Sequence, residues 1–148
     1  YQRESQTPAS SSDRFATLRP TRLHGEVVAS TLEQVLGELK PRDRVAREFS
    51  FDPSIPQEDI DGSIQQALML MNNPPIQQRI SKIAGELAKT KSDDELIKQT
   101  YLRVLARQPT GPELSRSKSY FKKVGQRGEA TEDLIWTLVN SAEFTTKR

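Results

Sequence analysis

The sequence has 148 residues, which is enough for one domain with a hydrophobic core, and its 22 Lys and Arg nearly balance 20 Asp and Glu. This balance and an aromatic content of 6% argue against a nucleic-acid-binding surface, which usually concentrates basic charge and stacking rings. The absence of cysteine excludes disulfides, thiolate nucleophiles and cysteine-ligated metals. No signal peptide or membrane-spanning stretch is visible, and the first residue is Tyr, so we expect a processed product or part of a longer chain.

Residues 1–22 are predicted to form an extended tail or linker, and residues 23–148 a single all-α domain. The first segment is rich in Ser, Thr, Gln and Arg, and it contains Pro8 and Pro20. With so few large apolar side chains it cannot bury enough surface to offset the entropy lost on ordering.

The first predicted helix begins at the sequence Ser30-Thr31-Leu32-Glu33, which has the pattern of a capping box. Its apolar residues repeat with helical spacing, and they are Leu32, Val35, Leu36 and Leu39. Pro41 is expected to end it.

A long loop is predicted near residues 40–61. Phe49 and Phe51 alternate with a polar residue as in a strand, but Pro53 and Pro56 prevent a regular run. We interpret the segment as an ordered loop anchored by the two rings. It could be a strap over one end of a helical bundle or a functional segment, and the sequence leaves both open.

The stretch 62–75 is predicted to contain a central buried helix, which the sequence Asn72-Asn73-Pro74-Pro75 ends. At 100° per residue its apolar side chains fall all round the axis, at Ile64, Leu68, Met69, Leu70 and Met71. The apolar run is far shorter than the roughly 20 residues that a membrane span requires. We therefore expect the other helices to enclose it, and exposure of Leu68 or Met71 would contradict this.

Two amphipathic helices are predicted next. Asn73 is a candidate N-cap followed by Pro74-Pro75 in the first turn. The buried stripe of that helix would consist of Ile76, Ile80, Ile83 and Leu87. Ser92 is the candidate cap of the following helix, with acidic residues in its first turn, where the helix dipole favours them.

The last two predicted helices complete a compact all-α bundle of about six helices. Thr110 and Glu113 form the next capping box, and Gly125 is expected near the end of that helix. The final helix is predicted from about Thr131 to Ser141, with Phe144 as a closing hydrophobic anchor. Trp136 lies off its main apolar face, so either two sides of this helix are buried or the indole contacts a partner.

No catalytic residue, cofactor site or metal site is predicted. His24 is the one histidine, and with no cysteine in the chain it has no partner for a metal site. The acidic residues of the segment 58–61 lack the glycine and terminal Glu of a calcium loop, so we interpret them as the start of the central helix.

Two groups of polar residues are candidates for binding. The first lies at predicted helix ends, where it could face a cleft shared with another domain or serve capping and inter-helix hydrogen bonds; it comprises Asn72, Asn73, Arg107 and Asn140. The second is a basic helix face that could bind an anionic polymer or be simply solvated; it comprises Arg116, Lys118, Lys122, Lys123 and Arg127.

Three motifs in order suggest a family. They are the QAL-x-x-x-N pattern within 64–72, the segment from Tyr101 through Thr110 with Glu113, and the segment 133–141 with Glu143-Phe144. Together they resemble the C-terminal domain of unknown function of large exported planctomycete proteins, which often carry a cytochrome-c-like module upstream. The resemblance covers roughly residues 45–148. The family's aromatic-rich ending with a terminal His is replaced by residues 145–148 here, so no role of that His carries over.

The resemblance implies an exported, periplasmic or extracellular bacterial setting and no established activity. Haem would belong to the upstream module, because this chain has no Cys-x-x-Cys-His. The leading hypothesis is a non-catalytic helical module for structure or protein interaction at the C-terminus of a larger protein. Its partners would be upstream domains or another protein. The alternatives are one wall of an active site shared with an upstream domain, and anionic-polymer binding through the 116–127 face.

Overall fold

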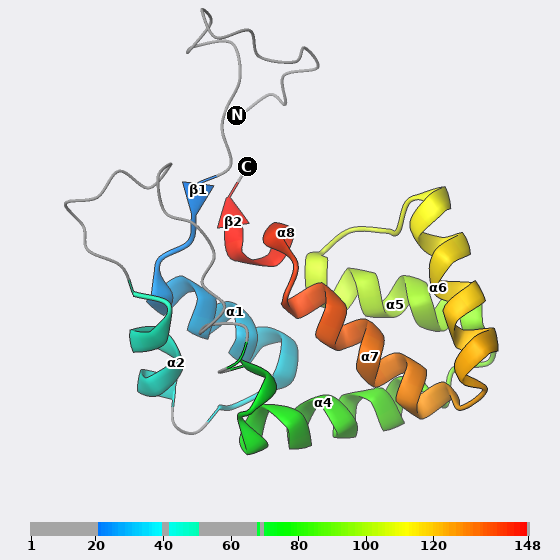
Figure 1. The fold of residues 1–148 in the computed structure, drawn as a ribbon, viewed down its shortest axis with the longest axis horizontal. Helices are drawn as coiled ribbons and strands as arrows, with labels where there is room; N and C mark the ends of the chain where they lie inside the picture. Colours follow the sequence, from blue (N-terminus) through cyan, green and yellow to red (C-terminus); the bar gives the residue numbers. More distant parts are fainter. Residues whose placement is uncertain (1–20, 40–41, 51–67, 69, 148) are drawn as a thin grey trace, which may run out of the picture.

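The structure, a computed structural model, describes residues 21–39, 42–50, 68 and 70–147 (Figure 1). Its described part contains seven helices and a two-residue strand at each end, which confirms the all-α prediction. The helices are α1 (Gly25–Leu36), α2 (Arg42–Glu48), α4 (Pro74–Leu87), α5 (Asp93–Leu105), α6 (Gly111–Val124), α7 (Arg127–Val139) and α8 (Ala142–Thr145). The strands are β1 (Thr21–Arg22) and β2 (Thr146–Lys147).

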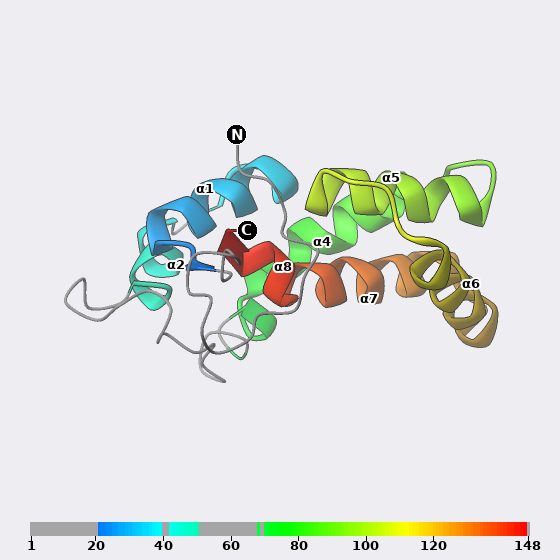
Figure 2. The same ribbon diagram turned by 90° about the horizontal axis from the view of Figure 1, so that it is seen from above.

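Helix α7 occupies the middle of the molecule. It packs against α4, α5 and α6, while α1 packs mainly against α2. Figures 1 and 2 show the α1–α2 pair at one end of the molecule and α5 with α6 at the other. One cluster of buried apolar side chains extends through all seven helices of the described part, and it joins the two ends.

The helix caps follow the predicted chemistry. The side chains of Asn73 and Ser92 accept hydrogen bonds from the backbone N–H three residues later, at 3.4 and 3.3 Å. Thr110 and Glu113 form a complete capping box, in which the Thr110 backbone N–H donates to the Glu113 carboxylate at 2.7 Å. Gly125 adopts φ 76° and ends α6, a conformation that glycine adopts at little cost.

The buried faces of the later helices also agree with the sequence pattern. The predicted stripe of α4 is buried at Ile76, Ile80 and Ile83. Phe144, which was expected to close the bundle, is 4% exposed. Two threonines, Thr100 and Thr131, are fully buried, and each hydroxyl donates to the carbonyl four residues earlier. Their polar atoms are therefore satisfied within their own helices.

The N-cap of the first helix lies six residues before the predicted cap, Ser30. The N-cap position is His24, and the helix ends at Gly37, which has φ 85°. The capping box at Ser30 is wrong, because Val28 extends the apolar stripe toward the N-terminus and is buried. Inside the helix, the Thr31 hydroxyl instead donates to the carbonyl of Val27 at 2.8 Å.

The predicted loop over 40–61 is interrupted by α2, so that prediction is wrong for residues 42–48. Val45, Ala46 and Phe49 share one side of this short helix and are buried. Their packing stabilises a helix that is too short to be stable alone in water. Burial of Phe49 agrees with its expected role as an anchor, whereas Phe51 and the rest of the loop lie outside the described residues.

The predicted central helix is not enclosed. Leu70 is 2% exposed, but Leu68 and Met71 are 49% and 53% exposed. At 100° per residue, these two exposed side chains lie about 60° apart on one side, and Leu70 points elsewhere. Of the described residues of this segment, Leu70 is therefore buried and Leu68 and Met71 face solvent, and α7 takes the central place. Residues 62–67 and 69 lie outside the described part.

The two ends of the described chain meet in a short strand pair that the sequence did not predict. β1 and β2 are antiparallel, with Thr21 opposite Lys147 and Arg22 opposite Thr146. The backbone N–H of Leu23 adds a hydrogen bond to the Thr145 carbonyl at 2.9 Å. Two residues are too few to produce a recognisable alternation of polar and apolar residues. Helix α7 also begins at Arg127, earlier than the predicted start near Thr131.

Candidate functional site

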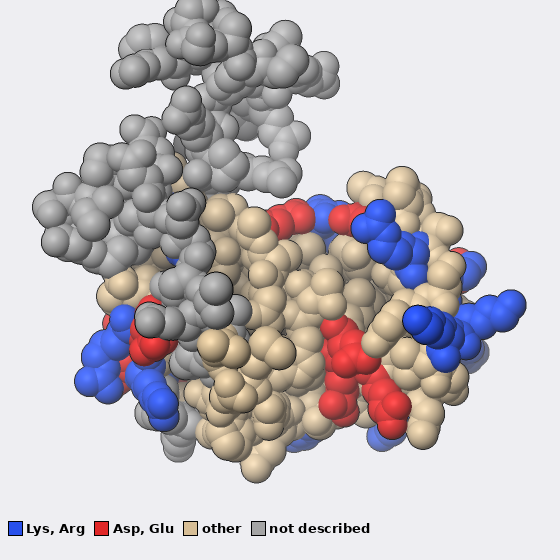
Figure 3. Space-filling view, in the orientation of Figure 1, with Lys and Arg blue, Asp and Glu red and all other residues tan. Residues whose placement is uncertain are grey.

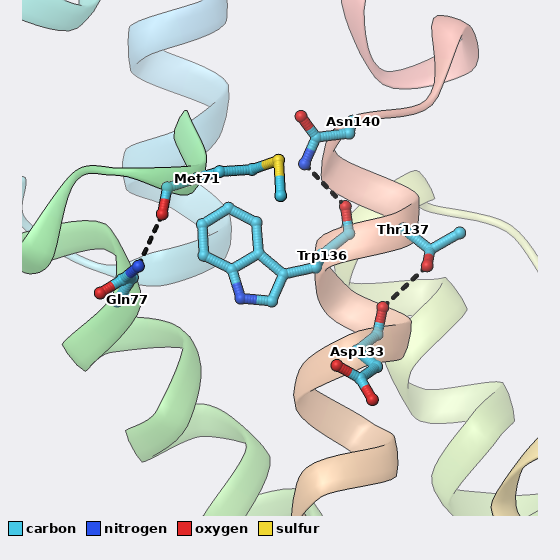
Figure 4. A pocket seen from close by; sticks show the side chains of 6 residues that line it. All are labelled: Met71, Gln77, Asp133, Trp136, Thr137 and Asn140. Atoms are coloured by element: carbon cyan, nitrogen blue, oxygen red, sulfur yellow. Dashed lines mark hydrogen bonds between the residues drawn. The ribbon is translucent and has the colours of Figure 1, made fainter. Parts of the chain in front are cut away.

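The candidate site is a pocket of about 450 Å³ on the solvent-facing side of α7 (Figure 4). Six residues line it: Met71, Gln77, Asp133, Trp136, Thr137 and Asn140. The last four come from α7 or its C-cap position, and their spacing places them on one side of the helix. The opposite side of α7 carries Leu134, Ile135, Leu138 and Val139, which are buried and hold the helix against the core.

The other wall of the pocket is fixed by the start of α4. Asn73 caps this helix and is buried, so the chain turns immediately after Met71. The Gln77 side-chain amide donates to the backbone carbonyl of Met71 at 2.6 Å. This hydrogen bond ties the segment before α4 to the first turn of that helix.

Trp136, the one tryptophan of the chain, is half-buried and forms an apolar wall. Its ring points from α7 toward Met71 and Gln77 (Figure 4). Met71 and Leu68 are both about half exposed and lie one turn apart on the same side of their segment. Large apolar side chains therefore remain accessible to solvent at this site.

The polar side chains of the pocket are bonded to nearby backbone. The Thr137 hydroxyl donates to the Asp133 carbonyl at 2.8 Å, and the Asn140 amide donates to the Trp136 carbonyl at 2.9 Å. The Gln77 amide does the same with the Met71 carbonyl, so each of the three side chains donates a hydrogen bond to a backbone carbonyl (Figure 4). These hydrogen bonds hold the polar side chains of the pocket in place. Each bond uses an N–H or O–H donor of the side chain rather than its acceptor oxygen.

The end of the pocket nearest α6 is acidic. Asp133 and Glu129 are exposed on α7, and Figure 3 shows carboxylates gathered over this helix beside an uncharged surface. The Tyr120 hydroxyl donates to the Asp133 carboxylate at 2.6 Å. This hydrogen bond raises the pKa of Tyr120, and burial and the charges of Asp133 and Glu129 raise it further.

The structure does not bring the four predicted polar candidates into one site. Asn140 lines the pocket, whereas Asn73 is the buried cap of α4. Asn72 is exposed beside that cap and does not line the pocket. Arg107 belongs to a separate cluster of ion pairs.

The Arg107 cluster joins three helices. The guanidinium contacts Glu113 at the start of α6 with two hydrogen bonds of 2.8 and 2.9 Å. It contacts Glu143 of α8 with two more, at 2.6 and 2.7 Å. It also lies 5.5 Å from the centre of the Tyr101 ring of α5, within the range of a cation–π contact. The arrangement is that of a structural clamp.

The charges of the clamp stabilise one another. The hydrogen bonds that Arg107 donates to Glu113 and to Glu143, in that order of size, raise the pKa of Arg107 above its ordinary value. The hydrogen bond with Arg107 is the largest cause that lowers the pKa of Glu113, from 4.5 to about 2. The Tyr101 pKa is raised, mainly by burial. Arg107 is therefore held as a cation between two carboxylates.

The predicted basic face is partly neutralised by α5. Lys118 pairs with Asp94 at 2.7 Å, and Arg127 pairs with Asp93 at 2.9 Å. Arg116, Lys122 and Lys123 are exposed on α6, and Figure 3 shows basic side chains projecting from this end of the molecule. An anionic partner would therefore meet fewer unpaired cations than the sequence suggests.

Within the part of the chain that the structure describes, no group of three or more His, Cys, Asp or Glu side chains could hold a metal ion. No helix there is long and apolar enough to cross a membrane. Comparison with known proteins gives no match to any family model, any curated protein or any solved structure.

Two of the pocket residues, Trp136 and Asn140, were candidates from the sequence. The other four, Met71, Gln77, Asp133 and Thr137, were not predicted to form a site with them. The spacing of Asp133, Trp136, Thr137 and Asn140 was a usable signal, because it places polar residues and the indole on one side of a helix. The contribution of Met71 and Gln77 depends on how α4 packs against α7, which the local pattern does not determine.

Proposed function

We propose that this chain is a non-catalytic helical module that binds another protein segment in the pocket on α7. The observation that carries the proposal is the half-buried Trp136 in a surface pocket, with Met71 more than half exposed at its rim. Tryptophan and methionine are enriched at protein interfaces, where a large apolar side chain gains much from being covered. Exposed apolar side chains that gather at a pocket mark interaction sites more often than isolated ones do.

The hydrogen bonds of the pocket support binding rather than chemistry. The side chains of Gln77, Thr137 and Asn140 hold neighbouring backbone carbonyls. These contacts keep the pocket in one shape before a partner arrives, which lowers the entropic cost of association. The resemblance to the planctomycete family would make an upstream domain of the same polypeptide the partner and would place the protein outside the cytoplasm. Both remain predictions.

Site-specific cross-linking tests the proposal, because the chain contains no cysteine. A Met71→Cys variant carries a thiol-linked photoreactive group at the rim of the pocket. A matched Ser119→Cys variant carries the same group on the exposed side of α6. Both would be exposed to the longer native polypeptide and to extract of the source organism, and their cross-linked products compared.

A defined product from position 71, absent from position 119, is expected. The same product should be lost when Trp136→Ser is added to the Met71→Cys variant. Equal labelling from both positions, or a product that persists without the indole, would contradict docking in the pocket.

A further inference from the structure

We propose that the partner presents an arginine side chain to this pocket, with its guanidinium stacked on Trp136 and paired with the Asp133 carboxylate. The inference rests on the proposed docking function and specifies the chemistry of the partner. The occupant is a segment of a protein in which apolar residues flank the arginine.

The pocket presents more acceptor than donor positions, which favours a ligand that donates hydrogen bonds. Gln77, Thr137 and Asn140 each commit a donor to backbone carbonyls, and their oxygen atoms accept none of these bonds. Asp133 accepts from Tyr120 through one oxygen, Oδ2, and an ionised carboxylate has further acceptor sites. A guanidinium carries five N–H donors and no acceptor, so it complements this surface.

The charge of the pocket favours the same ligand. No Lys or Arg is among the described residues that line it, whereas Asp133 lines it and Glu129 lies one turn earlier on the exposed side of α7. The charges of Asp133 and Glu129 both raise the pKa of the nearby Tyr120 hydroxyl. An incoming cation would therefore meet an attractive potential, and an acidic segment would be repelled.

The indole distinguishes arginine from other cations. A planar guanidinium stacks on an aromatic ring and also binds a carboxylate with two parallel hydrogen bonds, which an ammonium group cannot do. The same chain already uses this chemistry internally: Arg107 lies 5.5 Å from the Tyr101 ring centre and makes paired hydrogen bonds to Glu113 and Glu143.

The exposed apolar residues beside the pocket indicate a protein segment rather than a free small molecule. Leu68 and Met71 are 49% and 53% exposed and lie on one side of their segment. A bound arginine molecule would leave both in water. Apolar residues next to arginine in a peptide would cover them and add hydrophobic stabilisation.

Fluorescence titration tests the inference directly, because Trp136 is the one tryptophan of the chain. Three synthetic peptides would share a Leu-X-Leu centre between serines, with X as arginine, citrulline or glutamate. Citrulline keeps the shape of arginine and removes its charge. We expect the arginine peptide to shift the Trp136 emission with an affinity that falls as salt is added, and the other two peptides to bind more weakly.

Two variants locate the charge contact. Asp133→Asn should lower the affinity for the arginine peptide about fivefold, which is the effect expected from losing an exposed charge pair. Asp94→Asn removes the same charge from α5, where it pairs with Lys118, and should leave the affinity unchanged. Far-ultraviolet circular dichroism of both variants checks that the fold is retained.

The outcomes separate this inference from the docking function. If the citrulline or glutamate peptide binds as tightly as the arginine peptide, the arginine assignment is overturned and docking stands. If no peptide changes the emission while position 71 still gives its Trp136-dependent cross-link, the partner has different chemistry and the assignment fails. Self-association that competes with the peptides would identify a second copy as the occupant and also overturn it. Failure of both experiments overturns both proposals.

Discussion

Arg107 connects three helices of the described structure. Its guanidinium spans the start of α6 and α8, and the Tyr101 ring beside it belongs to α5. About one third of its side chain is exposed, so its charge is partly screened by water. The paired geometry offsets this screening, because bidentate hydrogen bonds between charged groups are stronger than single ones.

Replacing Arg107→Ala should lower the free energy of unfolding by about 2 kcal/mol, because it leaves Glu113 and Glu143 close together without a cation. Urea unfolding at neutral pH measures this. Arg116→Ala removes an exposed arginine from α6 and should change the free energy by less than about 0.5 kcal/mol. Equal effects of the two substitutions would show that the clamp does not stabilise the fold.

The same clamp predicts a loss of stability in acid. The folded-state pKa of Glu113 is about 2, below its ordinary value of 4.5. The ionised carboxylate therefore stabilises the folded state above pH 4.5, and this contribution is lost as the pH falls toward 2. With allowance for solvent screening, we expect about 1–2 kcal/mol.

Glu113→Gln isolates this contribution, because an amide does not titrate. Between neutral pH and pH ~3, the wild-type chain should lose more unfolding free energy in urea than the variant does. Parallel pH profiles of the two proteins would assign the acid sensitivity to other groups.

At the scale of elements, the close contact of α1 with α2 depends on a glycine. A Cβ on Gly25 would overlap the carbonyl oxygen of Ala46 and lie 2.9 Å from the Ser50 nitrogen. Both are backbone atoms, so the two helices would have to separate. Ion pairs also connect the two helices, because Arg42 of α2 lies 3.0 Å from both Glu26 and Glu33 of α1.

Gly25→Ala should therefore destabilise the protein by about 2–3 kcal/mol. Gly85 provides the matched control, because it is an exposed residue within α4 and a Cβ added to it would meet no atom within 4 Å. Gly85→Ala should stabilise by about 0.5–1 kcal/mol through helix propensity. Thermal unfolding of both variants measures these changes. If Gly25→Ala stabilised the protein, α1 and α2 would be able to move apart without a loss of stability.

At the scale of the whole molecule, several contacts join the two ends of the fold. The apolar cluster is continuous from α1 to α8. The Arg103 side chain of α5 donates to the Val35 carbonyl of α1 at 2.9 Å. β1 and β2 pair the start of the described chain with its end. These long-range contacts predict that the ends unfold together.

We expect one cooperative unfolding transition. Trp136 fluorescence reports on the contact between α4 and α7, and far-ultraviolet circular dichroism reports on all helices, so their urea midpoints should coincide. An earlier fluorescence midpoint would mean that the α4–α7 contact opens separately from the rest. The Arg103→Ala variant would then show whether the connection to α1 is responsible.

Features encoded over short distances were predictable from the sequence. Asn73, Ser92 and Thr110 cap helices as expected, because a cap depends on a few neighbouring residues. The stripe of α4 and the burial of Phe144 follow from spacing along one helix. Of the candidate site, the sequence indicated Trp136 and Asn140, whereas the role of Arg107 as a clamp requires Glu143, which lies 36 residues away.

The sequence by itself determined the helical class, most helix positions and the apolar faces, because these depend on local spacing and capping. Tertiary structure decided which apolar residues stay exposed. Leu68 and Met71 could not be distinguished from Leu70 by pattern, since burial depends on whether another element covers that side. The pocket on α7, the strand pair and the stability of α2 arise from contacts between distant segments. Packing therefore decided where the described part of the chain leaves apolar side chains exposed around a pocket.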